Sequence, residues 1–127
     1  MAAAPDTPAT PPTAHLAHWP EGLPRHLTLP ATHLFHNLEV SAARYPDKTF
    51  MLFYDSPLSY ARFKRDAEHL AGHLQQVAGV RAGDRVLLCM QNSPQWAIGF
   101  YAILRANAVV VPVNPMNRSE ELRHLAE

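Results

Sequence analysis

The chain has 127 residues, with 11 basic and 11 acidic side chains and a formal net charge of zero. This balance argues against a nucleic-acid partner or an anionic membrane surface, and the length allows one small domain. The only cysteine, Cys89, excludes an intrachain disulfide, so we expect a reducing, cytoplasmic location. No apolar run is long enough to span a bilayer, and no basic residue precedes Arg25, as a targeting signal would require.

The N-terminal segment differs in composition from the rest of the chain. Seven of the twelve prolines fall within residues 1–30, mixed with Ala, Thr and His, and no helical or strand periodicity is present there. Such a segment cannot bury enough apolar surface to form a core. We therefore expect a flexible, Pro/Ala-rich lead-in over residues 1–31 and a folded part over residues 32–127.

Two segments show the spacing of an amphipathic helix. We expect Thr32 to cap the first and Pro46 to stop it; its apolar face is Phe35, Leu38, Ala42 and Tyr45. We expect Ser59 to cap the second, whose apolar face is Tyr60, Phe63, Ala67, Leu70, Leu74 and Val77. The second has the strongest periodicity in the chain.

The other apolar runs have the composition of strands. Residues 49–54 are rich in β-formers and meet a turn cluster at residues 55–57, which predicts a short hairpin. After a turn at residues 81–84, the run at residues 86–90 predicts a strand buried on both faces, with Cys89 as a small core side chain.

A further helix and strand follow at once. Ser93 can cap a helix over residues 94–106, and Pro94 suits its first position. This helix is apolar nearly all round, so we expect it to be buried on more than one side. Asn107 can close it in the left-handed conformation, and a buried strand from residue 108 should stop at Pro112 and Pro115.

The last helix is expected after a cap at Ser119 or Asn117, with acidic residues in its first turn. The predicted order is then helix, hairpin, helix, strand, helix, strand, helix. This order is typical of an α/β fold with a parallel sheet, crossover helices and a short hairpin. The chain stops within the last helix without a stop signal, and we interpret this as truncation.

Three segments carry a family resemblance: Leu-Ser-Tyr-Ala-Arg-Phe at residues 58–63, Val-Arg-Ala-Gly-Asp-Arg-Val at 80–86, and the helix-to-strand segment at 102–115. Together they resemble the acyl-adenylate-forming superfamily of AMP-binding enzymes. Residues 91–95 with 112–117 are similar to fatty-acyl-CoA synthetases, the long-chain-fatty-acid–CoA ligases. Arg62 stands where the family usually has Glu, so half of a capping box is lost.

The resemblance implies that residues 32–127 are an incomplete N-terminal α/β subdomain, part of the N-terminal lobe of an ATP-dependent fatty acid–CoA ligase. In such a parent enzyme a carboxylate attacks the α-phosphate of ATP, pyrophosphate leaves, and the thiol of coenzyme A then displaces AMP. Fatty acid, ATP, Mg²⁺ and coenzyme A, and a homodimer contact, would belong to the parent enzyme.

The family's phosphate-binding loop, nucleotide-binding motifs and catalytic lysine have no counterpart in this sequence. Its five glycines lie no closer than four residues apart, so no Walker or dinucleotide loop can be built from them. We therefore predict no catalytic, cofactor-binding or metal residue in this chain, and we expect the chain to be inactive alone.

Four groups of residues suggest a site, but a structural interpretation is favoured for each. His69 and His73 lack a third metal ligand, and His33 and His36 lie in a solvated Ala/Pro-rich context. The basic cluster is expected to be a solvated helix face; it consists of Arg62, Lys64 and Arg65. The aromatic group has helical spacing, which predicts packing rather than ligand binding; it consists of Trp96, Phe100 and Tyr101.

Two alternatives remain open at this stage. The chain could be a complete, non-enzymatic α/β module that binds another protein through the exposed side of the helix at residues 94–106. It could also be a fragment of an enzyme that adenylates aryl or amino acids, since the same N-terminal pattern recurs across the superfamily. The class of carboxylate does not follow from these residues, because the family builds that pocket mainly from later sequence.

Overall fold

The computed structural model describes residues 13–126, and the chain divides into two units between Ala31 and Thr32. In the first unit, the segment η1 (Ala14–His18) is a short 3-10 helix that the sequence did not predict. The N–H of Leu16 donates to the carbonyl oxygen of Thr13 at 2.9 Å, and one such turn needs no apolar periodicity. Residues 1–12 of the predicted lead-in lie outside the described residues.

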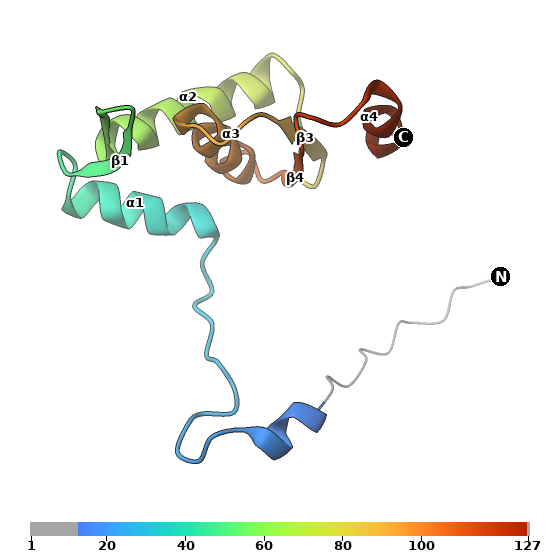
Figure 1. Ribbon diagram of the computed structural model, residues 1–127. Coiled ribbons are helices and arrows are strands. Elements are labelled where there is room, and N and C mark those ends of the chain that lie inside the picture. The colour runs from blue at the N-terminus through green and yellow to red at the C-terminus, as the bar shows by residue number, and fades with distance from the viewer. Residues whose placement is uncertain (1–12, 127) are drawn as a thin grey trace. The chain divides into compact units, whose positions relative to one another are not determined.

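The second unit contains the remaining elements in the predicted order (Figure 1): α1 (Leu34–Arg44), β1 (Thr49–Phe53), β2 (Ser56–Ser59), α2 (Tyr60–Gln76), β3 (Arg85–Cys89), α3 (Pro94–Arg105), β4 (Val109–Val113) and α4 (Ser119–Ala126). Helices α1, α2 and α3 all contact one another. The strands form an antiparallel pair, β1 with β2, and a parallel pair, β3 with β4, which α3 connects. The predicted α/β class, with a hairpin and a parallel pair, is confirmed.

Helix α1 buries Phe35, Leu38 and Ala42 as predicted, but its cap is one residue later than expected. The Nδ1 atom of His33, and not the hydroxyl of Thr32, accepts from the N–H of His36 at 3.2 Å. The side chain of a cap accepts from the N–H two or three residues later, and because the helix begins at Leu34, His33 is the residue at the cap position.

The hairpin turn also lies earlier than predicted. Tyr54 and Asp55, with φ of 44° and 60°, form the two-residue turn, whereas Ser56 and Pro57 pair with β1 as part of β2. Two central residues with positive φ match the twist of antiparallel strands, which explains why the turn forms there. Proline is tolerated in β2 because that strand lies at the edge of a two-stranded sheet.

Helix α2 starts as predicted, because the Oγ atom of Ser59 accepts from the N–H of Arg62 at 3.3 Å. The buried side chains of this helix are Phe63, Ala67 and Ala71. Val77 was predicted to extend the apolar face, but it caps the C-terminus and is 73% exposed. Gly79 and Gly83 then adopt positive φ in the connection to β3.

The parallel strands are less buried than their apolar sequences predict. Leu88 and Val86 pack toward the helices with Val110, whereas Leu87 and Val109 on the other face are 37% and 47% exposed. Cys89 is exposed, so the prediction of a core cysteine is wrong. Val113, which pairs with Cys89 on that other face, is buried, so within residues 13–126 the burial of this face is partial.

The C-terminal elements differ from prediction in two details. Pro112 does not stop β4; it lies within the strand and pairs with Leu88, which an edge position permits. Ser119 is the first residue of α4 rather than its cap. The N-terminus of α4 is stabilised instead by Glu121. Its Oε2 atom accepts from the N–H of Arg118 at 2.7 Å, which is the reciprocal half of a capping box.

Helix α3 is buried on several sides, as its apolar circumference predicts. The Oγ atom of Ser93 accepts from the N–H of Trp96 at 3.2 Å, with Pro94 in the first turn, and Asn107 has a φ of 61° beyond the C-terminus. One side contacts the cluster around Phe35 and Phe63, and another packs with Leu88. No helix within residues 13–126 is long and apolar enough to cross a membrane.

The crossing of α3 over β3 depends on a glycine. A Cβ atom on Gly99 would lie 3.0 Å from Cδ1 of Leu88, whereas one on Gly72 of α2 would meet nothing within 4 Å. We expect Gly99→Val to lower the free energy of unfolding by about 1–3 kcal/mol through overpacking. We expect the matched Gly72→Val to change it by less than about 0.5 kcal/mol. Urea unfolding of both variants measures this, and equal effects would contradict the close approach.

Candidate functional site

The carboxyl ends of the parallel strands form the most informative part of the surface. Cys89 pairs with Val113, so the segments that follow β3 and β4 leave the sheet at the same edge. Open parallel sheets bind ligands at this edge, because loops and helix N-termini converge there. Helix α3 begins at this edge, directly after the segment that follows β3.

A hollow of about 440 Å³ lies at this edge. It is lined by Met90, Gln91, Asn92, Trp96, Pro112, Val113, Asn114, Pro115 and Met116. Three of these side chains are amides and none is charged, while the others are apolar. The lining therefore suits a ligand that has neutral hydrogen-bonding groups along an apolar body.

Local hydrogen bonds hold the two walls of this edge hollow. The Ser93 cap fixes the start of α3 and so positions Trp96. On the other wall, the side-chain Oδ1 atom of Asn114 accepts from the N–H of Met116 at 3.0 Å. The backbone carbonyl oxygen of Asn114 accepts from the N–H of Asn117, also at 3.0 Å. Within residues 13–126 the Asn114 side-chain nitrogen donates to no protein group, so its N–H groups are free to donate to a ligand.

The lining of the edge hollow does not fit Mg²⁺ or the triphosphate of ATP. Mg²⁺ binds through oxygen ligands such as carboxylates, and none of the residues that line this hollow carries a carboxylate. A triphosphate requires cationic side chains or a loop of backbone N–H groups, and the lining of the edge hollow has no cation. The lining of the edge hollow suits contact with a neutral group and contains no acid, base or nucleophile.

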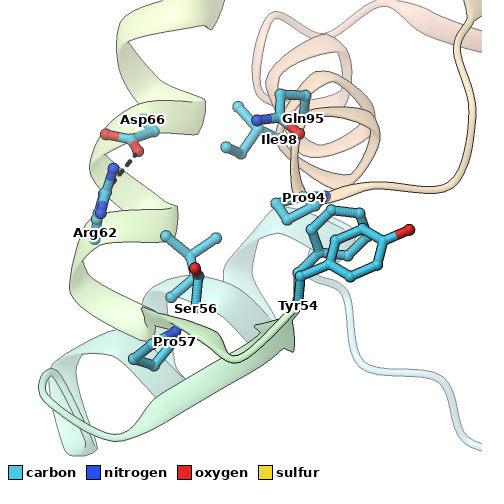
Figure 2. A pocket seen from close by; sticks show the side chains of 10 residues that line it. Tyr54, Ser56, Pro57, Arg62, Asp66, Pro94, Gln95 and Ile98 are labelled. Carbon is cyan, nitrogen blue, oxygen red and sulfur yellow. Dashed lines mark ion pairs between the residues drawn. The ribbon is translucent and has the colours of Figure 1, made fainter.

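A second hollow, of about 380 Å³, lies between the hairpin and the N-terminal parts of α2 and α3 (Figure 2). Its lining includes Arg62, which stands where the family that the sequence resembles usually has Glu. The Nε atom of Arg62 lies 3.6 Å from Oδ2 of Asp66, whose Oδ1 lies 3.6 Å from Nε of Arg65. Asp66 therefore balances the positive charge near the helix start, although the Arg62 side chain is 63% exposed, which makes the pair weak.

The other polar groups singled out from the sequence are surface features. His69 and His73 are exposed on α2, His36 pairs with Glu39 at 3.4 Å, and Lys64 pairs with Glu68 at 2.7 Å. Each basic residue of the predicted cluster on α2 is thus in an ion pair on its own helix. The interpretation of this cluster as a solvated helix face agrees with the structure.

The aromatic group packs as predicted, with one addition. Trp96 stacks on Phe100 with ring centroids 5.4 Å apart, and Tyr101 lies against Phe63 at the same distance. Trp96 also lines the edge hollow, a role that the sequence interpretation did not assign. Gln91 and Asn114 line the same hollow, whereas the sequence pointed to them only as part of the family resemblance. Two apolar strand segments, each followed by amide residues, were the signal that could have identified this edge.

Comparison with known proteins agrees with this architecture. Residues 38–127 match the AMP-binding enzyme family. The chain is 40% identical over 109 residues to a long-chain-fatty-acid–CoA ligase of Bacillus subtilis, which covers 86% of this chain and 19% of that protein. It is 34% identical over 92 residues to malpinin synthetase of Mortierella alpina, covering 72% of this chain and 1% of that protein.

Among solved structures, the N-terminal domain of FACL13 from Mycobacterium tuberculosis superimposes with a TM-score of 0.69 at 27% identity, covering 74% of this chain and 24% of that chain. This likeness confirms the predicted resemblance to N-terminal domains of acyl-adenylate-forming enzymes. The chain spans only a minor share of each relative's length, so it contains one part of the family's architecture. On the family match and this shared fold, the chain belongs to the AMP-binding enzyme family.

Proposed function

We propose that this chain is the N-terminal segment of an ATP-dependent fatty acid–CoA ligase and is inactive by itself. The observation that carries the proposal is its 40% identity to the Bacillus subtilis long-chain-fatty-acid–CoA ligase, of which it covers 19%. In the complete enzyme a fatty acid would be converted to an acyl-adenylate with release of pyrophosphate, and the thiol of coenzyme A would then displace AMP. Residues 32–127 would be an incomplete subdomain of that enzyme.

The role of this segment would be structural support for one wall of the ligand-binding region. The edge hollow supplies amides and Trp96 but no acid, base or nucleophile, so it suits the positioning of a neutral part of a substrate. ATP, Mg²⁺ and coenzyme A would bind mainly to other parts of the enzyme. A homodimer contact and a cytoplasmic location belong to the same proposal.

An open apolar groove supports the view that more protein covers this segment. The groove has a volume of about 340 Å³ and runs between α2, α3 and β3; its apolar lining includes Leu70, Leu74, Val86, Leu88 and Ile103. A surface with so little polar area usually marks an interface. We propose that further polypeptide of the same enzyme covers it.

An ATP–pyrophosphate exchange assay tests the proposal. With the 127-residue chain alone we expect no exchange that depends on fatty acid, because the lining of the edge hollow supplies neither a carboxylate for Mg²⁺ nor a cation for the triphosphate. A chimera in which this chain replaces the aligned segment of the Bacillus subtilis ligase should keep exchange with palmitate within about tenfold of that enzyme, since the two segments are 40% identical and similar side chains can pack against the rest of the enzyme. Exchange by the isolated chain, or a folded but inactive chimera, would contradict the proposal.

The reading frame beyond codon 127 distinguishes the alternatives. We expect it to continue and to encode a Ser/Thr/Gly-rich loop, because that composition lets backbone N–H groups bind phosphate. A stop codon, together with a monodisperse product that unfolds cooperatively, would favour the non-enzymatic binding module. If the continued polypeptide forms adenylates with aryl or amino acids but not with fatty acids, the parent belongs to that other branch.

The open groove and sheet face predict self-association of the isolated chain. We expect the 127-residue chain to be oligomeric, and Leu87→Lys on β3 to shift it toward monomer, because a charge there opposes burial of the groove. The control Leu27→Lys changes a side chain that is 82% exposed in the other unit and should have no effect. Analytical ultracentrifugation measures both. A monomeric wild-type chain with a sharp, reversible thermal transition would contradict this prediction.

A further inference from the structure

Strand β3 has one hydrogen-bonded neighbour, β4, and its outer edge is open within residues 13–126. The N–H of Val109 donates to the carbonyl oxygen of Asp84 at 2.8 Å, and Val109 pairs with Arg85 in the parallel register. Alternate residues of a parallel strand direct their backbone groups toward the same neighbour. The backbone groups of Arg85, Leu87 and Cys89 therefore point away from β4, and in the described part of the chain their N–H groups have no partner.

The outer edge of β4 is less suited to pairing with another strand. By the same alternation, the backbone groups of Val110 and Pro112 point away from β3. Pro112 has no N–H, and the N–H of Ala108 already donates to the carbonyl oxygen of Ile103 at 3.1 Å. A proline at an edge position opposes the addition of a further strand. The open edge of β3 is thus the better place for the sheet to grow.

The apolar groove beside α2 and α3 reaches this open edge. Its lining includes Leu88, which packs toward the helices, and Leu87, which lies on the opposite face of the sheet. A hollow that contacts both faces of β3 must run along the edge of that strand. Leu87 and Met90 in its lining are 37% and 40% exposed. A strand added here would bury apolar side chains as well as pair backbone groups.

We propose that the outer edges of β3 from two copies of this chain pair in antiparallel orientation about a two-fold axis at Leu87. Leu87 then lies opposite the same residue of the second copy, and Arg85 lies opposite Cys89. Bonded pairs recur at every second residue of an antiparallel ladder, so all three outward-facing residues exchange hydrogen bonds. Arg85 is the one charged residue among these three and faces a neutral side chain, so no like charges meet.

The second copy suits this edge because the edge is complementary to itself. A two-fold interface uses the same surface on both subunits, as this ladder does. The dimer would contain one four-stranded sheet, and sheets of three or more strands are more stable than a strand pair. The pairing gives a surface and a geometry to the self-association expected of the isolated chain, and it does not depend on the proposed function. In a longer enzyme a strand of the same polypeptide would occupy this edge.

Disulfide cross-linking tests the proposal on the full chain. The native thiol is first removed by Cys89→Ser, because it belongs to the proposed ladder. Leu87→Cys in this background places two thiols at the two-fold axis, with Cα atoms about 5.5 Å apart, which is within disulfide range. We expect oxidation to convert more than about half of this variant to a covalent dimer. The matched control Val110→Cys, on the outer edge of β4, should give about tenfold less, because Pro112 opposes pairing there.

Amide hydrogen exchange of the wild-type chain supplies a measurement without a substitution at the axis. Exchange is resolved to single residues and compared between a concentrated sample and one diluted until ultracentrifugation finds monomer. The N–H groups of Leu87 and Cys89 should exchange at least about fivefold faster after dilution, because they lose their partners, whereas that of Val110 should not change.

Three results would overturn the proposal. The first is a wild-type chain that is monomeric at every concentration. The second is equal formation of covalent dimer by Leu87→Cys and Val110→Cys. The third is exchange of the Leu87 N–H that does not depend on concentration.

Discussion

The burial of α3 is the constraint on which the α/β unit depends. This helix carries apolar side chains around most of its circumference, so no single neighbour can remove them from water. It contacts the aromatic cluster of Phe35 and Phe63 on one side and Leu88 of β3 on another. The approach to β3 is close because Gly99 has no side chain at the crossing. Helices α1 and α2 and the parallel strands are therefore arranged around α3.

The same packing creates the candidate site. Helix α3 starts at the carboxyl edge of the parallel pair, where its Ser93 cap and Pro94 determine the direction in which Trp96 enters the edge hollow. Asn114 reaches the opposite wall because β4 lies in register with β3. The edge hollow is thus formed by the packing of α3 against the ends of β3 and β4, and its lining contains no acid, base or nucleophile. Under the proposed function, this segment supports a ligand and other segments of the enzyme perform the chemistry.

One face of the parallel pair β3 and β4 leaves apolar side chains partly exposed. Strands with continuous apolar sequence normally have helices on both faces, yet Leu87 and Val109 are partly exposed here and Cys89 is exposed. The apolar sequence of these strands is therefore typical of a sheet that is covered more completely than it is within residues 13–126. The apolar groove beside α2 has the same character. Under the proposed function, further polypeptide of the same enzyme covers both features.

The sequence by itself determined the order of the elements in the α/β unit, the starts of α2 and α3 and the family, because caps and periodicities are local and the motifs are contiguous. It did not determine whether Thr32 or His33 caps α1, where the hairpin turns, or that Pro112 lies within a strand. Those outcomes depend on register and on the edge position of a strand, which only pairing between distant segments decides. The edge hollow likewise needed the tertiary structure, because two loops more than twenty residues apart meet only when β3 and β4 pair in parallel.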